Sequence, residues 1–192
     1  VKAERVTPDR PADVQQLRYS DEASIRQALG PRADQQLSVL LARGDVEMRV
    51  TGDSGQALRI YSDQAANYQL AGYSGMRYEM HFKNHSNRVY EVVATVDGLD
   101  VMSGQPGSLR NTGYLVRPGD KITIAGFRRS NQGVAAFRFS GKGNAYAANT
   151  PAGDSRNIGV IGVALFETRL DQPASSDTPR RPQGDAPNAF PA

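Results

Sequence analysis

Apolar and polar side chains alternate over several short stretches of this chain, and this spacing of two constrains its fold more than any other feature. Successive side chains of a β-strand point to opposite faces, so the pattern predicts strands with one buried face. In the clearest stretch, residues 77–83, the side chains on the apolar face are Tyr78, Met80 and Phe82. A turn at residues 84–87 precedes a second alternation over 89–96, and we expect these two strands to pair.

Turn signals separate the remaining strand candidates. Further strands are expected at residues 46–51, 57–61, 121–125, 134–139 and 157–168. The first two flank the Gly-rich turn 52–55 and predict a hairpin, whereas 157–168 is apolar on both faces and predicts a central or doubly covered strand. Residues 37–41 fit one face of a helix or of a strand equally well, and we favour a strand.

Together these stretches predict an all-β chain, built as a single antiparallel β-sandwich of the jelly-roll or immunoglobulin-like kind over residues 36–170. Residues 1–35 are polar and are expected to form an N-terminal arm with one short helix, which Ser20 can cap and which ends at Gly30. Residues 171–192 are rich in proline and polar side chains and predict an extended tail.

Composition excludes several classes of function. The 192 residues contain no cysteine, which removes disulfides, thiolate nucleophiles and cysteine-bound metals. The formal net charge is only +3 and the basic residues are scattered along the sequence, so we expect no nucleic-acid partner. No run of 18 apolar residues predicts a transmembrane segment. The sequence begins with Val1 and not with Met, and a lipid anchor on a preceding segment is compatible with it.

An ordered series of short motifs extends over residues 76–167. Its segments are Tyr90–Val101, Gly113–Asp120, Ile124–Arg128, Val134–Phe137, Ala145–Ala148 and Asn157–Ala164. The series resembles an uncharacterised family of exported bacterial β-rich proteins. The resemblance implies a periplasmic, outer-membrane-associated or extracellular location, and it transfers no catalytic residue.

Three residue patterns were weighed as reactive or metal-binding sites. The Asp-Ser-Gly core of residues 52–55 is typical of a trypsin-like nucleophile loop, but the only histidines, His81 and His85, lack the expected motif. On a strand followed by a turn, those two histidines lie about 13 Å apart and do not suit one metal ion. Asp97, Asp100 and Asp120 have carboxylates of the kind that bind calcium, but they do not form a calcium-binding loop motif. We therefore predict no catalytic, cofactor-binding or metal-binding residue.

Aromatic and arginine side chains near long loops are the best candidates for contact with a partner, because these residue types dominate interface hot spots. The candidates are Tyr114, Phe127, Arg128, Tyr146 and Phe190. If the loops 102–112 and 141–154 lie at one end of the domain, they can build a recognition surface.

The leading hypothesis is a non-enzymatic envelope or secreted accessory subunit that binds other protein subunits through loops, strand edges and terminal extensions. A module that binds a small ligand or a glycan is the alternative. A hydrolase with an unrecognised site is the weakest of the three. No cofactor is expected.

Overall fold

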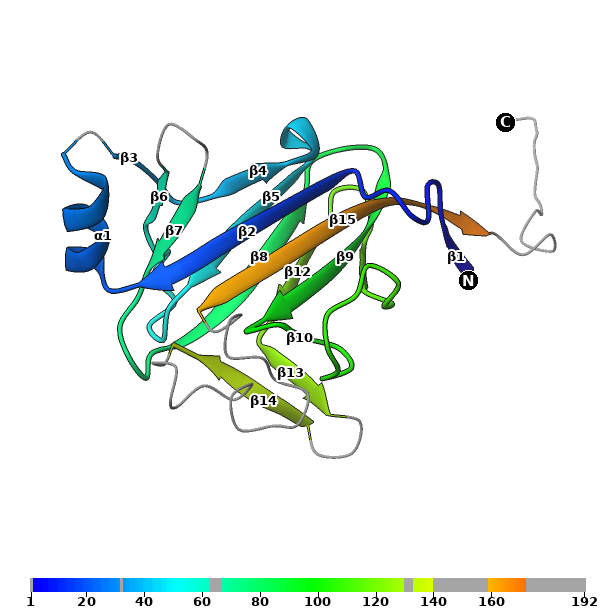
Figure 1. The fold of residues 1–192 in the computed structure, drawn as a ribbon. Coiled ribbons are helices and arrows are strands. Elements are labelled where there is room, and N and C mark those ends of the chain that lie inside the picture. The colour runs from blue at the N-terminus through cyan, green and yellow to red at the C-terminus, as the bar shows by residue number, and fades with distance from the viewer. Residues whose placement is uncertain (1, 32, 63–66, 130–132, 140–158, 172–192) are drawn as a thin grey trace.

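The structure is a computed structural model that describes residues 2–31, 33–62, 67–129, 133–139 and 159–171. These residues form two β-sheets, the helix α1 (Glu22–Leu29) and one 3-10 turn (Ala42–Gly44), as Figure 1 shows. The chain is therefore mostly β, as its alternating pattern predicts.

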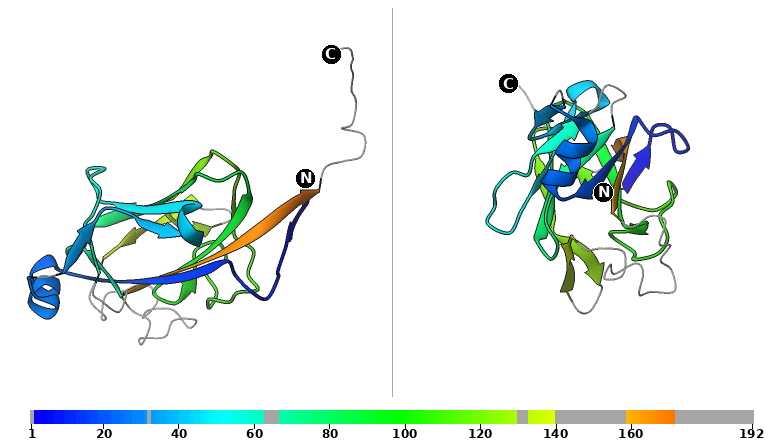
Figure 2. Two further views of the ribbon diagram at one scale, coloured as in Figure 1. Left: turned by 90° about the horizontal axis from the view of Figure 1, so that it is seen from above. Right: turned by 60° about the vertical axis from the view of Figure 1, so that its left-hand side comes forward.

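The larger sheet has nine strands. They are β1 (Lys2–Arg5), β2 (Asp13–Ser20), β3 (Asp34–Gln36), β6 (Ile60–Ser62), β7 (Tyr68–Ala71), β9 (Val89–Val96), β10 (Leu99–Asp100), β11 (Tyr114–Val116) and β15 (Val160–Asp171). Their order is β10-β9-β15-β2-β7-β6-β3, with β11 also paired to β9 and β1 also paired to β15. The two strands β1 and β15 project together at one end of the molecule (Figure 2).

The smaller sheet has six strands. They are β4 (Val39–Leu41), β5 (Val46–Thr51), β8 (Arg77–Asn84), β12 (Lys121–Ile124), β13 (Gly126–Arg129) and β14 (Gly133–Arg138). Their order is β13-β14-β8-β5-β4, with β12 also paired to β8. The strand β4 confirms the strand prediction for residues 37–41, and Val39 and Leu41 are buried.

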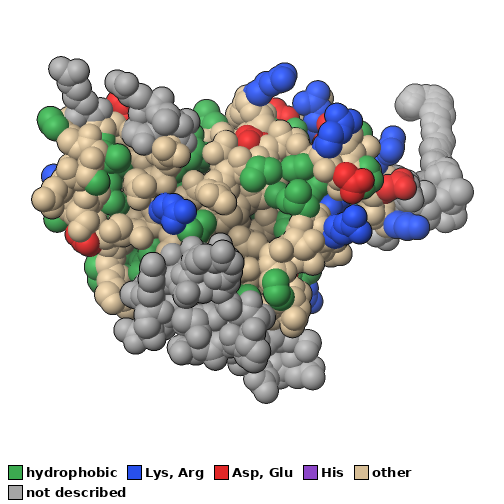
Figure 3. All heavy atoms as spheres, viewed as in Figure 1, with side chains coloured by type: hydrophobic (Ala, Val, Ile, Leu, Met, Phe, Trp, Pro, Cys, Tyr) green, Lys and Arg blue, Asp and Glu red, His purple; other side chains and the backbone are tan. Residues whose placement is uncertain are grey.

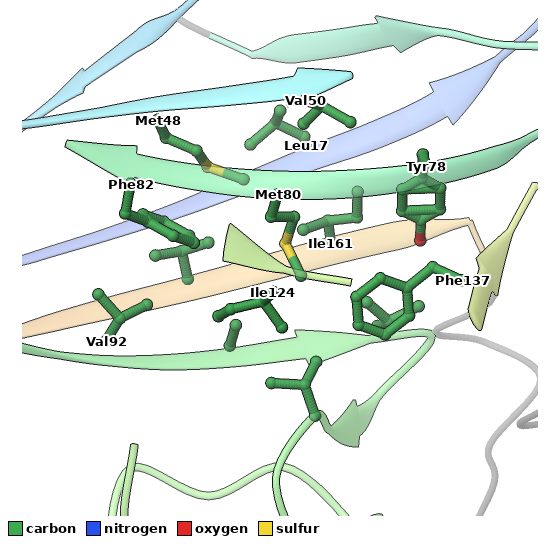
Figure 4. Close-up of a cluster of buried hydrophobic side chains, with 14 of the residues drawn as sticks. Leu17, Met48, Val50, Tyr78, Met80, Phe82, Val92, Ile124, Phe137 and Ile161 are labelled. Carbon is green, nitrogen blue, oxygen red and sulfur yellow. The ribbon is translucent and has the colours of Figure 1, made fainter. Parts of the chain in front are cut away.

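One hydrophobic cluster contains side chains from both sheets (Figure 4). The smaller sheet contributes Met48, Tyr78, Met80 and Phe82, among others, and the larger sheet contributes Leu17, Val92 and Ile161. Along β8 every second residue is buried, as the alternation over 77–83 predicts. The side chains of Arg77, Glu79, His81 and Lys83 therefore lie on the outer face of the smaller sheet.

The predicted pairing of the strands before and after the turn 84–87 is wrong. β8 pairs with β5, β12 and β14, whereas β9 pairs with β15, β10 and β11 in the other sheet. The turn 52–55 also leads from one sheet to the other. The last hydrogen bond across it is made by the Leu58 N–H, and Ile60 already pairs within the larger sheet. Both turns carry the chain between sheets, and alternation alone cannot distinguish such a crossover from a hairpin.

The N-terminal region also differs from the expected polar arm. β2 lies inside the larger sheet, antiparallel to β15 and parallel to β7, and its Leu17 is fully buried. The parallel pair corrects the expectation of antiparallel pairing throughout. Leu17 is the one fully buried side chain of a strand whose other residues are mostly polar, so the sequence of β2 gives little strand signal.

The short helix expected in this region is confirmed as α1. It begins one residue later than expected, because Asp21 and not Ser20 caps it, and the Asp21 carboxylate accepts a hydrogen bond from the Ser24 N–H at 2.9 Å. Ile25 is the buried residue of the helix, and Gly30 ends it with a φ of 78°. No helix in the part of the chain described above has the length and apolar character needed to cross a membrane.

Candidate functional site

The outer faces of β2, β15 and β9 form the floor of a groove. The register of these strands aligns their outward residues in two rows. The first row is Val14, Ala164 and Val93, and the second is Gln16, Gly162 and Thr95. A Cβ atom at Gly162 would lie 2.6 Å from the Thr95 hydroxyl oxygen, so the glycine accommodates a neighbouring side chain.

A loop between β10 and β11 forms one wall of the groove. Pro106 bridges to Leu99, and the Gly107 N–H donates a hydrogen bond to the Gly98 carbonyl at 2.9 Å. A Cβ atom at Gly107 would lie 2.7 Å from the methyl group of Thr95. The absence of a side chain at this position therefore lets the loop lie close against β9.

The groove has a volume of about 520 Å3 and is lined by thirteen residues, none of which is charged. Two large apolar side chains that line it, Val14 on the floor and Leu109 on the wall, are 53% and 45% exposed. Figure 3 shows hydrophobic side chains gathered on this face of the larger sheet. Burying a charged group here would cost hydration without providing a counter-charge, so the groove favours an uncharged, apolar ligand.

Arg5 anchors the loop that forms this wall. Its Nε atom lies 2.6 Å from Oε1 of Glu91, and its guanidinium donates to the carbonyls of Leu109 at 2.5 Å and Asn111 at 2.6 Å. The guanidinium also lies 3.7 Å above the ring of Phe166. One side chain of β1 thus joins β9, β15 and the loop, although 86 residues separate Arg5 from Glu91.

A buried carboxylate lies at the end of β9. Oδ1 of Asp97 accepts hydrogen bonds from the Tyr19 hydroxyl at 2.9 Å and from the Gly159 N–H at 2.8 Å. Asp97 is 3% exposed and has a φ of 53°. Burial raises the pKa of its carboxyl group, and the two hydrogen bonds oppose this effect. The carboxylate thus connects β2, β9 and the start of β15.

At pH 7, we expect the free energy of unfolding of Asp97→Asn to be at most about 1 kcal/mol below that of the wild type. Asparagine retains the acceptor oxygen and tolerates a positive φ. Because the folded-state pKa of Asp97 is raised, the wild type loses stability as the pH rises from about 3.8 through that pKa. The stability of the variant relative to the wild type should therefore decrease as the pH is lowered. Urea unfolding of both proteins between pH 4 and 8 measures this difference, and a difference independent of pH would contradict it.

Of the predicted partner-contact residues, the three that the structure describes are not among the residues that line the groove. Phe127 is buried and its ring packs edge-on against Phe137 with 5.1 Å between centroids, so the prediction of a surface contact is wrong for it. Tyr114 is half-buried against the core, and Arg128 is exposed on β13. Burial raises the pKa of Tyr114, and the positive charge of Arg128 opposes this rise. Tyr146 and Phe190 lie outside the described residues.

The Asp-Ser-Gly pattern of residues 52–55 forms a turn, closed by a hydrogen bond from the Gly55 N–H to the Gly52 carbonyl. The nearest candidate base in sequence, His81, has other partners. Its two ring nitrogens lie 2.8 Å from the Thr51 hydroxyl and 2.9 Å from the Thr123 hydroxyl. Burial lowers the pKa of His81, with a further contribution from Arg49.

The two histidines do not form a shared site. Nε2 of His85 lies 2.9 Å from Glu47, whereas His81 lies between two threonines. Within the described ranges, no three His, Asp or Glu side chains form a group that could hold a metal ion. Asp100 acts as a turn residue, because its carboxylate accepts hydrogen bonds from the backbone N–H groups of Met102 and Ser103.

Comparison of the chain with protein-family models, with curated proteins and with solved structures finds no match. The groove is thus the site that geometry alone indicates. The sequence contains a weak signal for it in Gly107 and Gly162, which both lie against Thr95. Pairing of β2 with β15 creates the rest of the groove, and no local pattern predicts that pairing.

Proposed function

We propose that this protein is a non-enzymatic accessory subunit of the bacterial envelope or a secreted one, and that an uncharged, apolar segment of a protein partner occupies the groove. The observation that carries this proposal is the exposure of Val14 and Leu109 on a groove without charged lining residues. Covering apolar surface of this kind contributes about 25 cal/mol per Å2 to binding, before the costs of association.

We infer further that the two sheets form a single β-sandwich domain of the jelly-roll or immunoglobulin-like kind. The hydrophobic cluster drawn from both sheets supports this inference. The proposed domain extends beyond residues 36–170, because β1 and β2 pair with β15. The proposed location rests on the resemblance of residues 76–167 to exported proteins.

A protein partner suits the groove better than a sugar does. Sugar-binding sites combine polar groups that fix the ligand with aromatic side chains that pack on it, and none of the thirteen described lining residues is aromatic. Its floor instead consists of small and β-branched side chains on three strands, together with two glutamines. Such a surface fits the side chains of an extended apolar peptide.

A photo-crosslinking residue at position 109 tests the proposal in the native cells. We expect a discrete protein adduct from Leu109, and we expect the additional change Val14→Asp to reduce its yield about tenfold or more. The matched control is Leu40→Asp, because Leu40 is an exposed apolar strand residue (59%) away from the groove. An adduct that persists with Val14→Asp, or that Leu40→Asp removes equally, would contradict the proposal.

A further inference from the structure

The outer face of the smaller sheet carries five basic side chains, which lie apart in the sequence. They are Arg49 on β5, Arg77 and Lys83 on β8, Lys121 on β12 and Arg138 on β14. On β8 the buried side chains alternate with Arg77 and Lys83, so these two basic side chains face outward. The other three are register partners of outward residues of β8 and share that face. Strand pairing thus gathers charges that the sequence shows only as scattered residues.

The register places basic residues directly opposite each other along β8. Arg77 faces Arg138, and Arg49 faces His81. Lys83 faces Lys121 on one side and Glu47 on the other. Like charges directly opposite across a strand pair destabilise a sheet. A bound anion would relieve this repulsion along a strip of about 20 Å, the length of β8 from Arg77 to Lys83 at about 3.3 Å per residue.

Few acidic groups balance these charges. Among the described residues, no carboxylate lies within 4.0 Å of any of the five basic groups. On the same face Glu47 pairs with His85 at 2.9 Å, and Glu79 lies 3.9 Å from His81. Asp53 lines a hollow with Arg77 at one end of the strip. The five basic side chains therefore outnumber these three acidic ones, and the face has a net positive charge.

We propose that this strip, defined by Arg49, Arg77, Lys83, Lys121 and Arg138, binds a linear acidic polysaccharide. The strip is a flat run of cations on adjacent strands, which suits an extended polymer with regularly spaced acid groups. The outward residues of β5 and β8 include no aromatic or large aliphatic side chain. This absence disfavours base stacking with a single-stranded nucleic acid and the apolar centre of a protein interface. The strip lies on the opposite sheet from the groove and does not depend on its function.

Heparin, a linear sulfated polysaccharide, is the probe for a binding titration with the full chain at about 50 mM salt, where screening is weak. We expect the triple change Arg49→Gln, Lys83→Gln and Lys121→Gln to weaken binding about tenfold. The control removes three exposed charges elsewhere, with Arg10→Gln, Arg18→Gln and Arg43→Gln, and should change affinity about twofold or less. Equal losses in the two triples, or no binding by wild type, would overturn the proposal.

Competition decides the class of partner. Heparin should be displaced by polygalacturonate at lower concentration than by duplex DNA or polyglutamate, and the reverse order would overturn the assignment to a polysaccharide. The His81 ring gives a second measurement on wild type. An anion on the strip favours the imidazolium ion, so heparin should raise the pKa of His81 measured by NMR. An unchanged pKa at saturation would place heparin elsewhere.

Discussion

Arg5→Ala is expected to lower the free energy of unfolding by about 3 kcal/mol or more. The change leaves the Glu91 carboxylate without a counter-charge where its side chain is only 10% exposed. It also removes the donors to the Leu109 and Asn111 carbonyls and the cation above Phe166. Urea unfolding followed by circular dichroism measures the loss.

Two further variants separate the ion pair from a general effect of charge. Arg18→Ala, at an exposed position of β2, should change stability by about 0.5 kcal/mol or less. The double change Arg5→Met with Glu91→Gln should lose less than Arg5→Ala, because a neutral amide costs less to bury than an unpaired carboxylate. Glutamine also retains an acceptor for the Gly113 N–H, which donates to Oε2 of Glu91 at 2.7 Å. A double variant less stable than Arg5→Ala would contradict the unpaired charge as the cause.

Gly113→Ala is expected to cost about 3 kcal/mol or more, the upper end for overpacking, although it adds only one methyl group. A Cβ atom at this position would overlap the carbonyl oxygen of Val92 on the neighbouring strand β9. Backbone atoms of a central strand cannot turn aside as a side chain can, so β11 or the loop before it must move. Thermal unfolding of the variant, with circular dichroism to confirm its β content, measures the loss.

Gly162→Ala is the matched control for this second change. The new methyl group would meet the hydroxyl of Thr95, which can rotate away, so the cost should stay at about 1 kcal/mol. Comparable losses from the two glycine changes would show that the close approach of residue 113 to β9 is not the cause.

Alternation of apolar and polar residues was sufficient to find most strands. β8 and β9 fall where the alternation predicts them, and the burial of every second residue in β8 matches its spacing. β15 overlaps the stretch 157–168, which was predicted from apolar residues on both faces. Partners were predicted less well, because β8 and β9 lie in different sheets although one short turn joins them. A turn defines a change of direction, whereas the choice of sheet depends on contacts with distant strands.

The candidate sites depended on the same missing information. Val14 lies in a polar segment with no strong strand signal, yet pairing with β15 places it on the floor of the groove. Lys83 and Lys121 lie 38 positions apart in the sequence, yet they are register partners. Residue type predicted an interface role for Phe127, but its ring packs in the core. The sequence shows which residue types are present, whereas the register of the strands determines which of them lie side by side.

The ribbon formed by β1 and β15 has a mechanical consequence. Lys2 and Asp171 are register partners at its end, so a pull applied through these two points would separate the strands one residue pair at a time. Such peeling meets low resistance, because each pair bears the load alone. It would stop at Arg5, where the guanidinium is joined to Glu91 and to the loop before β11. Arg5 therefore marks the point at which tension entering through either segment reaches the body of the larger sheet.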